Sequence, residues 1–208
     1  MDSPNTPQRG NLQSKKQDLV RHEIWHAAID LFYLQGFDEV TIDQIAERAG
    51  VSRRTFFRYF ASKDDVMGST TKAYGEALEH AIRAEAPALG AFEVAKRSVA
   101  NVLMCQPSSA ITERVLQIGK RSSAALSAQF LQLPAVEEKL ARAFAVRTGR
   151  LDGPSINDRI IASVAFAATK LCVDLWVGEP KREVEEIVED IFAKLSSICA
   201  TPEKRPGK

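Results

Sequence analysis

Apolar residues recur every three or four positions along most of this 208-residue chain, which is the spacing of one face of an α-helix. Alternating apolar and polar runs are nearly absent, and the β-branched residues fall inside the helical pattern. Glycine and proline interrupt the pattern often enough to divide it into about nine segments. The pattern therefore predicts an all-α fold of about nine helices, with three short helices followed by longer ones from Lys63 onward.

The first predicted helix, residues 18–35, contains the stretch HEIWH. It matches the H-E-x-x-H pattern of zinc hydrolases, in which two imidazoles bind the metal and the glutamate acts as general base. A catalytic zinc needs a third protein ligand, and the chain has one further histidine, His80. His22 and His26 also lie opposite the apolar stripe of the helix. We therefore expect both histidines to face solvent, with His22 and Arg21 near a phosphate, and assign no catalytic or metal-binding residue. A zinc hydrolase using His22, Glu23 and His26 is the alternative hypothesis.

Residues 41–63 carry the signals of two short helices joined by a tight turn. Thr41 and Gln44, three positions apart, form a capping box at the start of the first of them. Gly50 suits the left-handed backbone that ends this helix, and Ser52 caps the next one at once. Two short helices joined by a turn containing glycine are typical of a helix-turn-helix, whose second helix normally lies in the major groove of DNA.

The side chains of this region suit contact with DNA. The region holds five basic and two acidic residues, whereas the whole chain has a net charge of only +1. Arg53 and Arg54 stand in the first turn of the second helix, where a guanidinium can donate two hydrogen bonds to guanine. Thr55, Tyr59 and Lys63 are placed to contact a phosphate or a thymine methyl group. The alternative is a solvated basic helix, which the caps and the turn make less favourable.

The stretch AAIDLFYLQGFDEVTIDQIAERAGVSRRTFFRYFASKDDV resembles the TetR family of bacterial one-component transcriptional regulators. The resemblance covers residues 18–66, and beyond them only the layout of helices is similar. It implies a DNA-binding domain at 18–63 and a ligand-binding and dimerisation domain at 64–200, between polar tails at 1–17 and 201–208. The DNA-contact residues that we predict, the cap Ser52 included, are Thr41, Ser52, Arg53, Arg54, Thr55, Phe57, Tyr59 and Lys63.

Two of these residues depart from the family pattern. Phe57 stands where the family often has tyrosine, so a phosphate-binding hydroxyl is missing and only apolar contact is expected. Arg54 stands where the family often has glycine or proline. We therefore expect Arg54 to give this chain an operator preference of its own.

The last two predicted helices carry wide apolar stripes. Such stripes fit a core within one chain, but the resemblance implies that the two helices meet their copies in a twofold four-helix bundle. A dimer also suits DNA recognition, because one short helix offers few base contacts and two copies can read a palindrome. The predicted dimer interface consists of Ile161, Val164, Leu171, Leu175, Val184, Ile187, Val188, Ile191 and Leu195.

The amphipathic helices between these ends are candidates to enclose an effector cavity, although each residue named is individually typical of plain core. The stretches ITERVLQIG, VRTG and LWVGE resemble a branch of the family whose ligands are acyl-CoA-type molecules, which favours a small hydrophobic or amphipathic effector. Polar side chains such as Arg114 could orient it, whereas Lys170 and Asp174 have the simpler alternative of an ion pair one turn apart. The candidate lining residues are Val102, Met104, Phe130, Phe144, Phe166 and Trp176.

Composition sets the remaining expectations. A hydrophobic content of 45% with 26% charged residues is typical of globular proteins, and three widely spaced cysteines suggest reduced, buried thiols. Charged residues interrupt the most apolar stretch, IIASVAFAATKLCVDLWV, so no membrane span is expected. We therefore expect a cytoplasmic, nucleoid-associated homodimer that binds a palindromic double-stranded operator and is released from it by a small-molecule effector. A repressor is expected, with an activator on the same scaffold as the alternative, and we expect no cofactor and no enzymatic activity.

Overall fold

The computed structural model describes residues 8–105, 109–179 and 181–200, which form ten α-helices and no strand. This confirms the all-α prediction and adds one helix, because the segment predicted after Pro107 is divided in two. The buried Ser122 makes the division, since its Oγ accepts a hydrogen bond from the backbone N–H of Ala125 at 3.2 Å and so caps a new helix. The helices are α1 Gln8–Gln35, α2 Ile42–Arg48, α3 Arg53–Tyr59, α4 Lys63–Ala84, α5 Ala91–Met104, α6 Ser109–Arg121, α7 Ser123–Phe130, α8 Leu133–Arg147, α9 Ile156–Gly178 and α10 Val184–Ala200.

Helix α1 begins ten residues before the predicted start at residue 18. Its first turns are rich in glutamine and lysine, which favour a helix, but they carry no apolar stripe that a sequence pattern could reveal. The predicted tail at 1–17 is thus helical from Gln8, while residues 1–7 and the predicted tail at 201–208 lie outside the described residues.

The chain divides into two compact units. One comprises the chain up to Thr70 together with Arg114–Phe130, and the other comprises Thr71–Glu113 together with the chain from Leu131 onward. The sequence instead predicts a domain boundary at residues 63 and 64. The C-terminal part of α6 and all of α7 therefore belong to the same unit as the three N-terminal helices.

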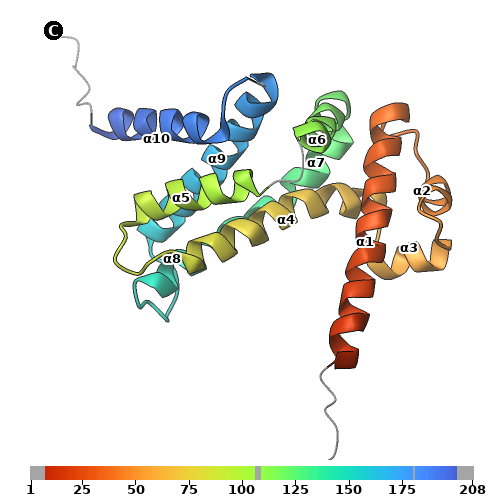
Figure 1. The fold of residues 1–208 in the computed structure, drawn as a ribbon, viewed down its shortest axis with the longest axis horizontal. Helices are drawn as coiled ribbons and strands as arrows, with labels where there is room; N and C mark the ends of the chain where they lie inside the picture. Colours follow the sequence, from red (N-terminus) through yellow and green to blue (C-terminus); the bar gives the residue numbers. More distant parts are fainter. Residues whose placement is uncertain (1–7, 106–108, 180, 201–208) are drawn as a thin grey trace, which may run out of the picture. The chain divides into compact units, whose positions relative to one another are not determined.

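The first unit is built on α1, α2 and α3, drawn in red and orange in Figure 1. Ile24 and Phe32 of α1 are buried with Ile45 of α2 and Phe56 of α3, and each of them is 0–1% exposed. Burying a side chain of this size stabilises the fold by about 1.5–3 kcal/mol. The two short helices, only seven residues each, are therefore held by this core rather than by their own backbone hydrogen bonds.

The second unit is built around α9, which packs against α5, α8 and α10. Small buried residues on α9, such as Ala162, Ala165 and Ala168, let its neighbours approach closely. By length and composition α9 is also apolar enough to cross a membrane, although no membrane span is expected from the sequence. A third of its most apolar window is buried, and a single helix of this kind is weak evidence because core helices of soluble proteins pass the same test.

Candidate nucleic-acid interface

The two helices of the predicted DNA-reading motif begin and end where the sequence indicates. Thr41 Oγ1 accepts a hydrogen bond from Gln44 N at 3.3 Å, and Gln44 Oε1 accepts one from Thr41 N at 2.8 Å, which completes the capping box. Gly50 has a φ of 64°, the left-handed conformation expected at the end of α2. Ser52 Oγ then accepts a hydrogen bond from Thr55 N at 3.1 Å and caps α3.

Helix α3 separates its aromatic core residues from its polar ones. Phe56 is fully buried, as is Phe60, the residue that follows the helix. The predicted contact residues lie on the other sides, where Arg53, Arg54 and Phe57 are exposed and Thr55 and Tyr59 are half-buried. The structure thus brings the predicted contact residues of α3 to its accessible surface.

Arg53 does not extend freely from this surface. Its Nη1 lies 2.8 Å and 2.7 Å from the two carboxylate oxygens of Asp43, in the first turn of α2. Its guanidinium also stacks over the ring of Phe57, 5.5 Å from the ring centre. Phe57 therefore supports an arginine with its aromatic face, a role that the expectation of plain apolar contact did not include.

Arg54 contrasts with Arg53. The residue is exposed, and its side chain forms no hydrogen bond or ion pair with any residue that the structure describes. Arg58 is exposed as well, and its Nη2 donates to the hydroxyl of Tyr59 at 3.2 Å rather than to a carboxylate. Arg54 and Arg58 consequently carry the charge of α3 that no acidic group of the described chain neutralises.

The ammonium group of Lys63 is already bound within the protein. It donates to the backbone carbonyls of Phe37, Asp38 and Val40, at 2.8, 3.0 and 3.3 Å, and lies 4.8 Å from the centre of the Phe37 ring. An ammonium has three donors, so these carbonyls account for all of them. In this arrangement Lys63 fixes the turn between α1 and α2 to the start of α4, and the phosphate contact predicted from the sequence stays a prediction.

An acidic residue that the sequence pattern did not single out joins three helices. Asp30 of α1 forms an ion pair with Arg114 of α6 and lies 3.8 Å from the guanidinium of Arg48, in the last turn of α2. Nearby, Arg121 of α6 donates to the Tyr33 carbonyl oxygen at 3.3 Å. Asp30 and Arg48 are 18 positions apart in the sequence, and Arg114 lies 66 positions after Arg48, so no local pattern could have revealed the network.

Comparison with known proteins agrees with this geometry. Residues 24–69 match the model of the tetR family of bacterial regulatory proteins. TcmR, an HTH-type transcriptional regulator of Streptomyces glaucescens, is 28% identical over 221 aligned positions, which cover 99% of this chain and 97% of TcmR. Residues 24–69 are a TetR-family DNA-binding region. The chain is accordingly a DNA-binding transcriptional regulator with α2 and α3 as its helix-turn-helix.

Solved structures of bacterial regulators share the fold of this chain. NalD, the secondary repressor of a multidrug efflux pump in Pseudomonas aeruginosa, aligns with a TM-score of 0.56 at 18% identity and covers 88% of this chain and 96% of its own. The fatty acid degradation regulator FadR of Bacillus halodurans aligns with a TM-score of 0.57 at 17% identity and covers 93% and 96%. At such identities the likeness concerns the fold alone.

The predicted effector-pocket residues of this regulator do not share one environment. Val102 and Phe144 are buried, Phe166 and Trp176 are half-buried, and Met104 is 56% exposed. Phe130, which is 48% exposed, belongs to the other compact unit. Lys170 and Asp174, the alternative ligand-orienting residues, form the simple ion pair instead, at 2.8 Å.

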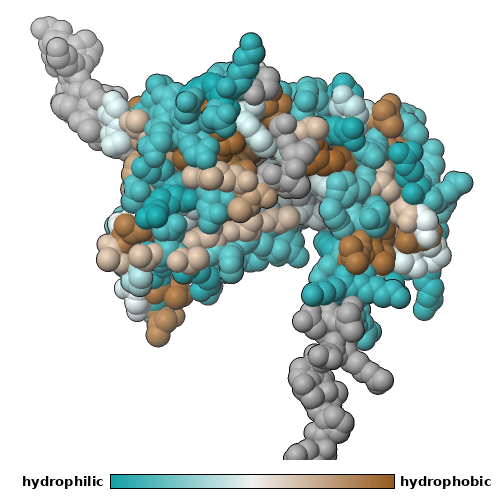
Figure 2. Space-filling model, viewed as in Figure 1, coloured by the Kyte–Doolittle hydropathy of each residue, from teal (hydrophilic) through white to brown (hydrophobic). Residues whose placement is uncertain are grey.

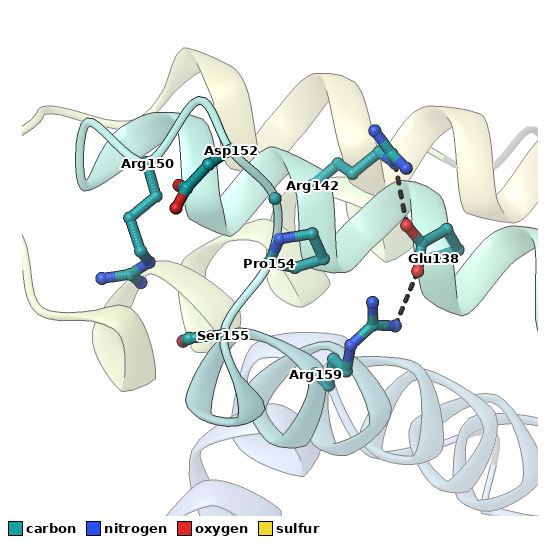
Figure 3. A pocket seen from close by; sticks show the side chains of 8 residues that line it. Glu138, Arg142, Arg150, Asp152, Pro154, Ser155 and Arg159 are labelled. Carbon is teal, nitrogen blue, oxygen red and sulfur yellow. Dashed lines mark hydrogen bonds and ion pairs between the residues drawn. The ribbon is translucent and has the colours of Figure 1, made fainter.

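A cleft of about 430 Å³ lies elsewhere in the second unit, at the start of α9 (Figure 3). Glu138 stands between Arg142 and Arg159 and accepts hydrogen bonds from them at 2.8 and 2.6 Å. Arg150 forms an ion pair with the buried Asp158, at 2.6 Å. Burial alone would raise the pKa of Asp158, but hydrogen bonds from Arg150 and from the helix cap outweigh it and hold that pKa below its ordinary value. Each of the three arginines of the cleft is thus paired with a carboxylate of the chain itself, two of them sharing Glu138.

The predicted dimer-interface residues divide between core and surface. Ile187, Val188 and Ile191 are at most 5% exposed within the single chain, because α10 packs them against α5 and α9. Leu171 is 48% exposed, and the remaining members, Ile161, Val164, Leu175, Val184 and Leu195, are half-buried or exposed. On the face seen in Figure 2, hydrophilic residues predominate and hydrophobic ones emerge in separate small patches.

The two histidines of the H-E-x-x-H stretch face each other on α1. Their Nε2 atoms are 3.0 Å apart, and burial followed by the charge of His22 lowers the pKa of His26. Among the residues that the structure describes, no group of three or more histidine, cysteine or acidic side chains could hold a metal ion. The described chain therefore assembles no three-ligand site of the kind a zinc hydrolase uses.

The cysteines are not all buried as predicted. Cys172 is, and burial raises the pKa of its thiol to about 12, whereas Cys105 is exposed at the end of α5. The side chain of Cys199 lies outside the described residues.

Proposed function

We propose that this regulator is a cytoplasmic homodimeric repressor that binds a palindromic operator and is released by a small hydrophobic or amphipathic effector. The observation that carries the proposal is the ionic network around Asp30, because it joins α6, α1 and the helix-turn-helix. A ligand acts on an equilibrium only through contacts that differ between two states, so effector release requires a physical connection of this kind.

Two interactions of the network join α6 to α1. Arg114 pairs with Asp30 at one level, and two turns later Arg121 donates to the Tyr33 carbonyl. Both guanidiniums also face the Tyr33 ring, 5.6 and 5.2 Å from its centre. A shift of α6 would therefore displace α1. Through Asp30 it would also displace Arg48, at the end of α2.

Operator reading is assigned to α3 and its caps. Arg54 donates hydrogen bonds to base edges. Arg53 does the same when DNA displaces its partner Asp43, and Tyr59 and Thr55 contact the DNA backbone. Thr41 and Ser52 act mainly as caps that present backbone N–H groups to phosphates.

The dimer is assigned to the outward side of α9. Ile160 and Leu171 on that side are 55% and 48% exposed, with Ala167 exposed between them. These positions are four and seven residues apart and so share one helix face. A substitution of Leu171 by glutamate should convert the dimer to monomers in sedimentation velocity, whereas glutamate at the exposed Leu151, outside α9, should not.

The function is tested with the operator recovered by selection from random duplexes and with palmitoyl-CoA, palmitate and CoA as effector probes. Wild-type protein should bind a palindrome, lower transcription from a promoter that contains it, and leave the DNA when palmitoyl-CoA is added. Arg114→Ala should bind the operator but respond less. Higher transcription would indicate an activator, no response to any probe would refute the effector class, and a full response of Arg114→Ala would refute the relay.

A further inference from the structure

The two histidines of the H-E-x-x-H stretch lie close together on α1. His22 and His26 stand one helical turn apart on α1, with ring centres 4.2 Å apart and Nε2 atoms 3.0 Å apart. At this distance one Nε2–H can donate to the other Nε2, and the tautomers of the rings decide which one donates. His22 is exposed and His26 is half-buried, so water and ions reach the pair.

The imidazole rings of His22 and His26 both lie near the Trp25 ring. The Trp25 ring meets His26 edge to face, with centres 5.0 Å apart, and lies 6.4 Å from His22. Its own Nε1–H donates to Thr70 Oγ1 of α4 at 3.4 Å, which ties the tryptophan to a second helix. The two imidazoles are consequently placed by neighbours rather than left to rotate freely, which lowers the entropic cost of using both at once.

The separation of the two nitrogens suits a shared metal ion. Nitrogen ligands bind transition metals at about 2.0–2.1 Å, so two of them at a right angle are about 2.9 Å apart and two in a tetrahedron about 3.4 Å. The observed 3.0 Å falls within this range before any ion binds. Histidines at positions i and i+4 of a helix are also the pair that helical metal sites use.

Among the residues that the structure describes, no third histidine, cysteine or acidic side chain joins the pair to form a metal-binding group. The charges of Glu23, Asp30 and Arg114 act on His26, and Asp30 is itself paired with Arg114 and lies 3.8 Å from Arg48. Water must therefore fill the other coordination positions, which favours reversible binding over a closed structural site.

We propose that His22 and His26 form a binding site for a divalent late first-row transition-metal ion on the outer face of α1. Imidazole nitrogen suits Zn²⁺, Ni²⁺ and Cu²⁺, and affinity at such a site should rise from Zn²⁺ or Ni²⁺ to Cu²⁺. Both Nε2 atoms must be deprotonated to bind the ion, so ion binding competes with protons. The site has two protein ligands, His22 and His26.

Tryptophan fluorescence offers a direct test, because Ni²⁺ and Cu²⁺ quench a nearby indole. The chain has two tryptophans and three histidines, so Trp176→Phe leaves Trp25 as the reporter and His80→Asn is a matched control on α4. Full-length protein without a histidine tag is titrated with Ni²⁺. Quenching should saturate at one ion per chain, and His22→Asn or His26→Asn should each weaken it by about tenfold or more. His80→Asn should leave it unchanged, and Zn²⁺ should reverse it.

Thermal unfolding shows whether a variant loses Ni²⁺ binding only because it is less well folded. Ni²⁺ should raise the melting temperature of the wild type and of His80→Asn but not that of His26→Asn, all compared with samples in chelator. Equal Ni²⁺ affinity in the wild type, His22→Asn and His26→Asn would overturn the proposal, as would quenching that His80→Asn abolishes.

Discussion

Two regions of the molecule are rich in arginine, and only one of them is suited to meet DNA. In the cleft at the start of α9, Arg142 and Arg159 share Glu138, and Arg150 is held by Asp158. On α3, by contrast, Arg54 and Arg58 have no acidic partner among the described residues. The number of arginines is similar, but only unneutralised charge attracts a phosphate backbone and releases its counterions.

The same comparison refines the charge argument within the helix-turn-helix. Of its five basic residues, Arg48 lies near Asp30, Arg53 is paired with Asp43, and Lys63 is bound to carbonyls. The excess of basic residues in the sequence therefore overstates the charge that is immediately available. What remains is concentrated on two side chains of one short helix.

The largest effect is expected for Arg54→Ala. A bidentate contact to a base is worth about 1–3 kcal/mol, so operator affinity should fall about tenfold to a hundredfold and the preference at the contacted base should relax. Arg142→Ala, an equal loss of charge in the cleft, is the control and should bind as the wild type does. Fluorescence anisotropy on the operator and on single-base variants measures both, and an unchanged affinity of Arg54→Ala would remove it from the interface.

Asp158→Asn should instead affect stability. Asp158 is 4% exposed, accepts from Arg150 and belongs to the cap of α9, so its loss should lower the free energy of unfolding by about 2 kcal/mol. Because its pKa is lower in the folded state, this stabilisation is complete above the unfolded pKa and is lost as pH falls through the folded pKa. Urea unfolding should therefore show a gap between wild type and variant that narrows in acid, and a gap independent of pH would contradict the assignment.

Lys63→Met tests whether the lysine serves the fold or the DNA. The methionine keeps an apolar stem over Phe37 but removes three hydrogen bonds, so the free energy of unfolding should fall by about 1–2 kcal/mol. The salt dependence of operator binding should stay the same. A stable variant whose salt slope falls by about 0.9 would show instead that Lys63 neutralises a phosphate.

The smallest effect is expected for Asp43→Asn, which releases Arg53. Binding to unrelated duplexes should strengthen by about twofold to fivefold, while the ratio of operator to unrelated affinity should fall, because a charge is gained and an arginine is no longer oriented. Asp64→Asn removes an exposed carboxylate from the first turn of α4 and serves as the control for charge alone. The same drop in the affinity ratio for both variants would rule out a positioning role for Asp43.

The sequence predicted the helices where a local signal exists. The caps Thr41 and Ser52, the left-handed Gly50 and the buried Phe56 all follow from patterns a few residues long, and the structure confirms them. The start of α1 was missed because its polar first turns have no apolar face to reveal them. Local signals of this kind define elements but not their partners.

Long-range pairings escaped prediction for that reason. Nothing in the residues near Asp43 or Lys63 indicates which group ten or twenty-five positions away each one binds. The wide stripe of α10 likewise fits either a core or a dimer; Ile187, Val188 and Ile191 are buried within one chain, and the dimer stays a prediction. An apolar face shows that something covers it, but the sequence does not distinguish a neighbouring helix from a second copy.

The central claim, that α3 and not the arginine-lined cleft meets DNA, is tested most directly by the salt dependence of operator binding in two double variants. Arg54→Ala with Arg58→Ala removes the unpaired arginines, and Arg142→Ala with Arg159→Ala removes two paired ones. The α3 variant should bind weakly, with a slope of log affinity against log salt shallower by about 0.9 for each phosphate that is no longer neutralised. The cleft variant should keep the wild-type affinity and slope. A cleft variant that binds weakly with a shallower slope, while the α3 variant binds as the wild type does, would contradict the claim.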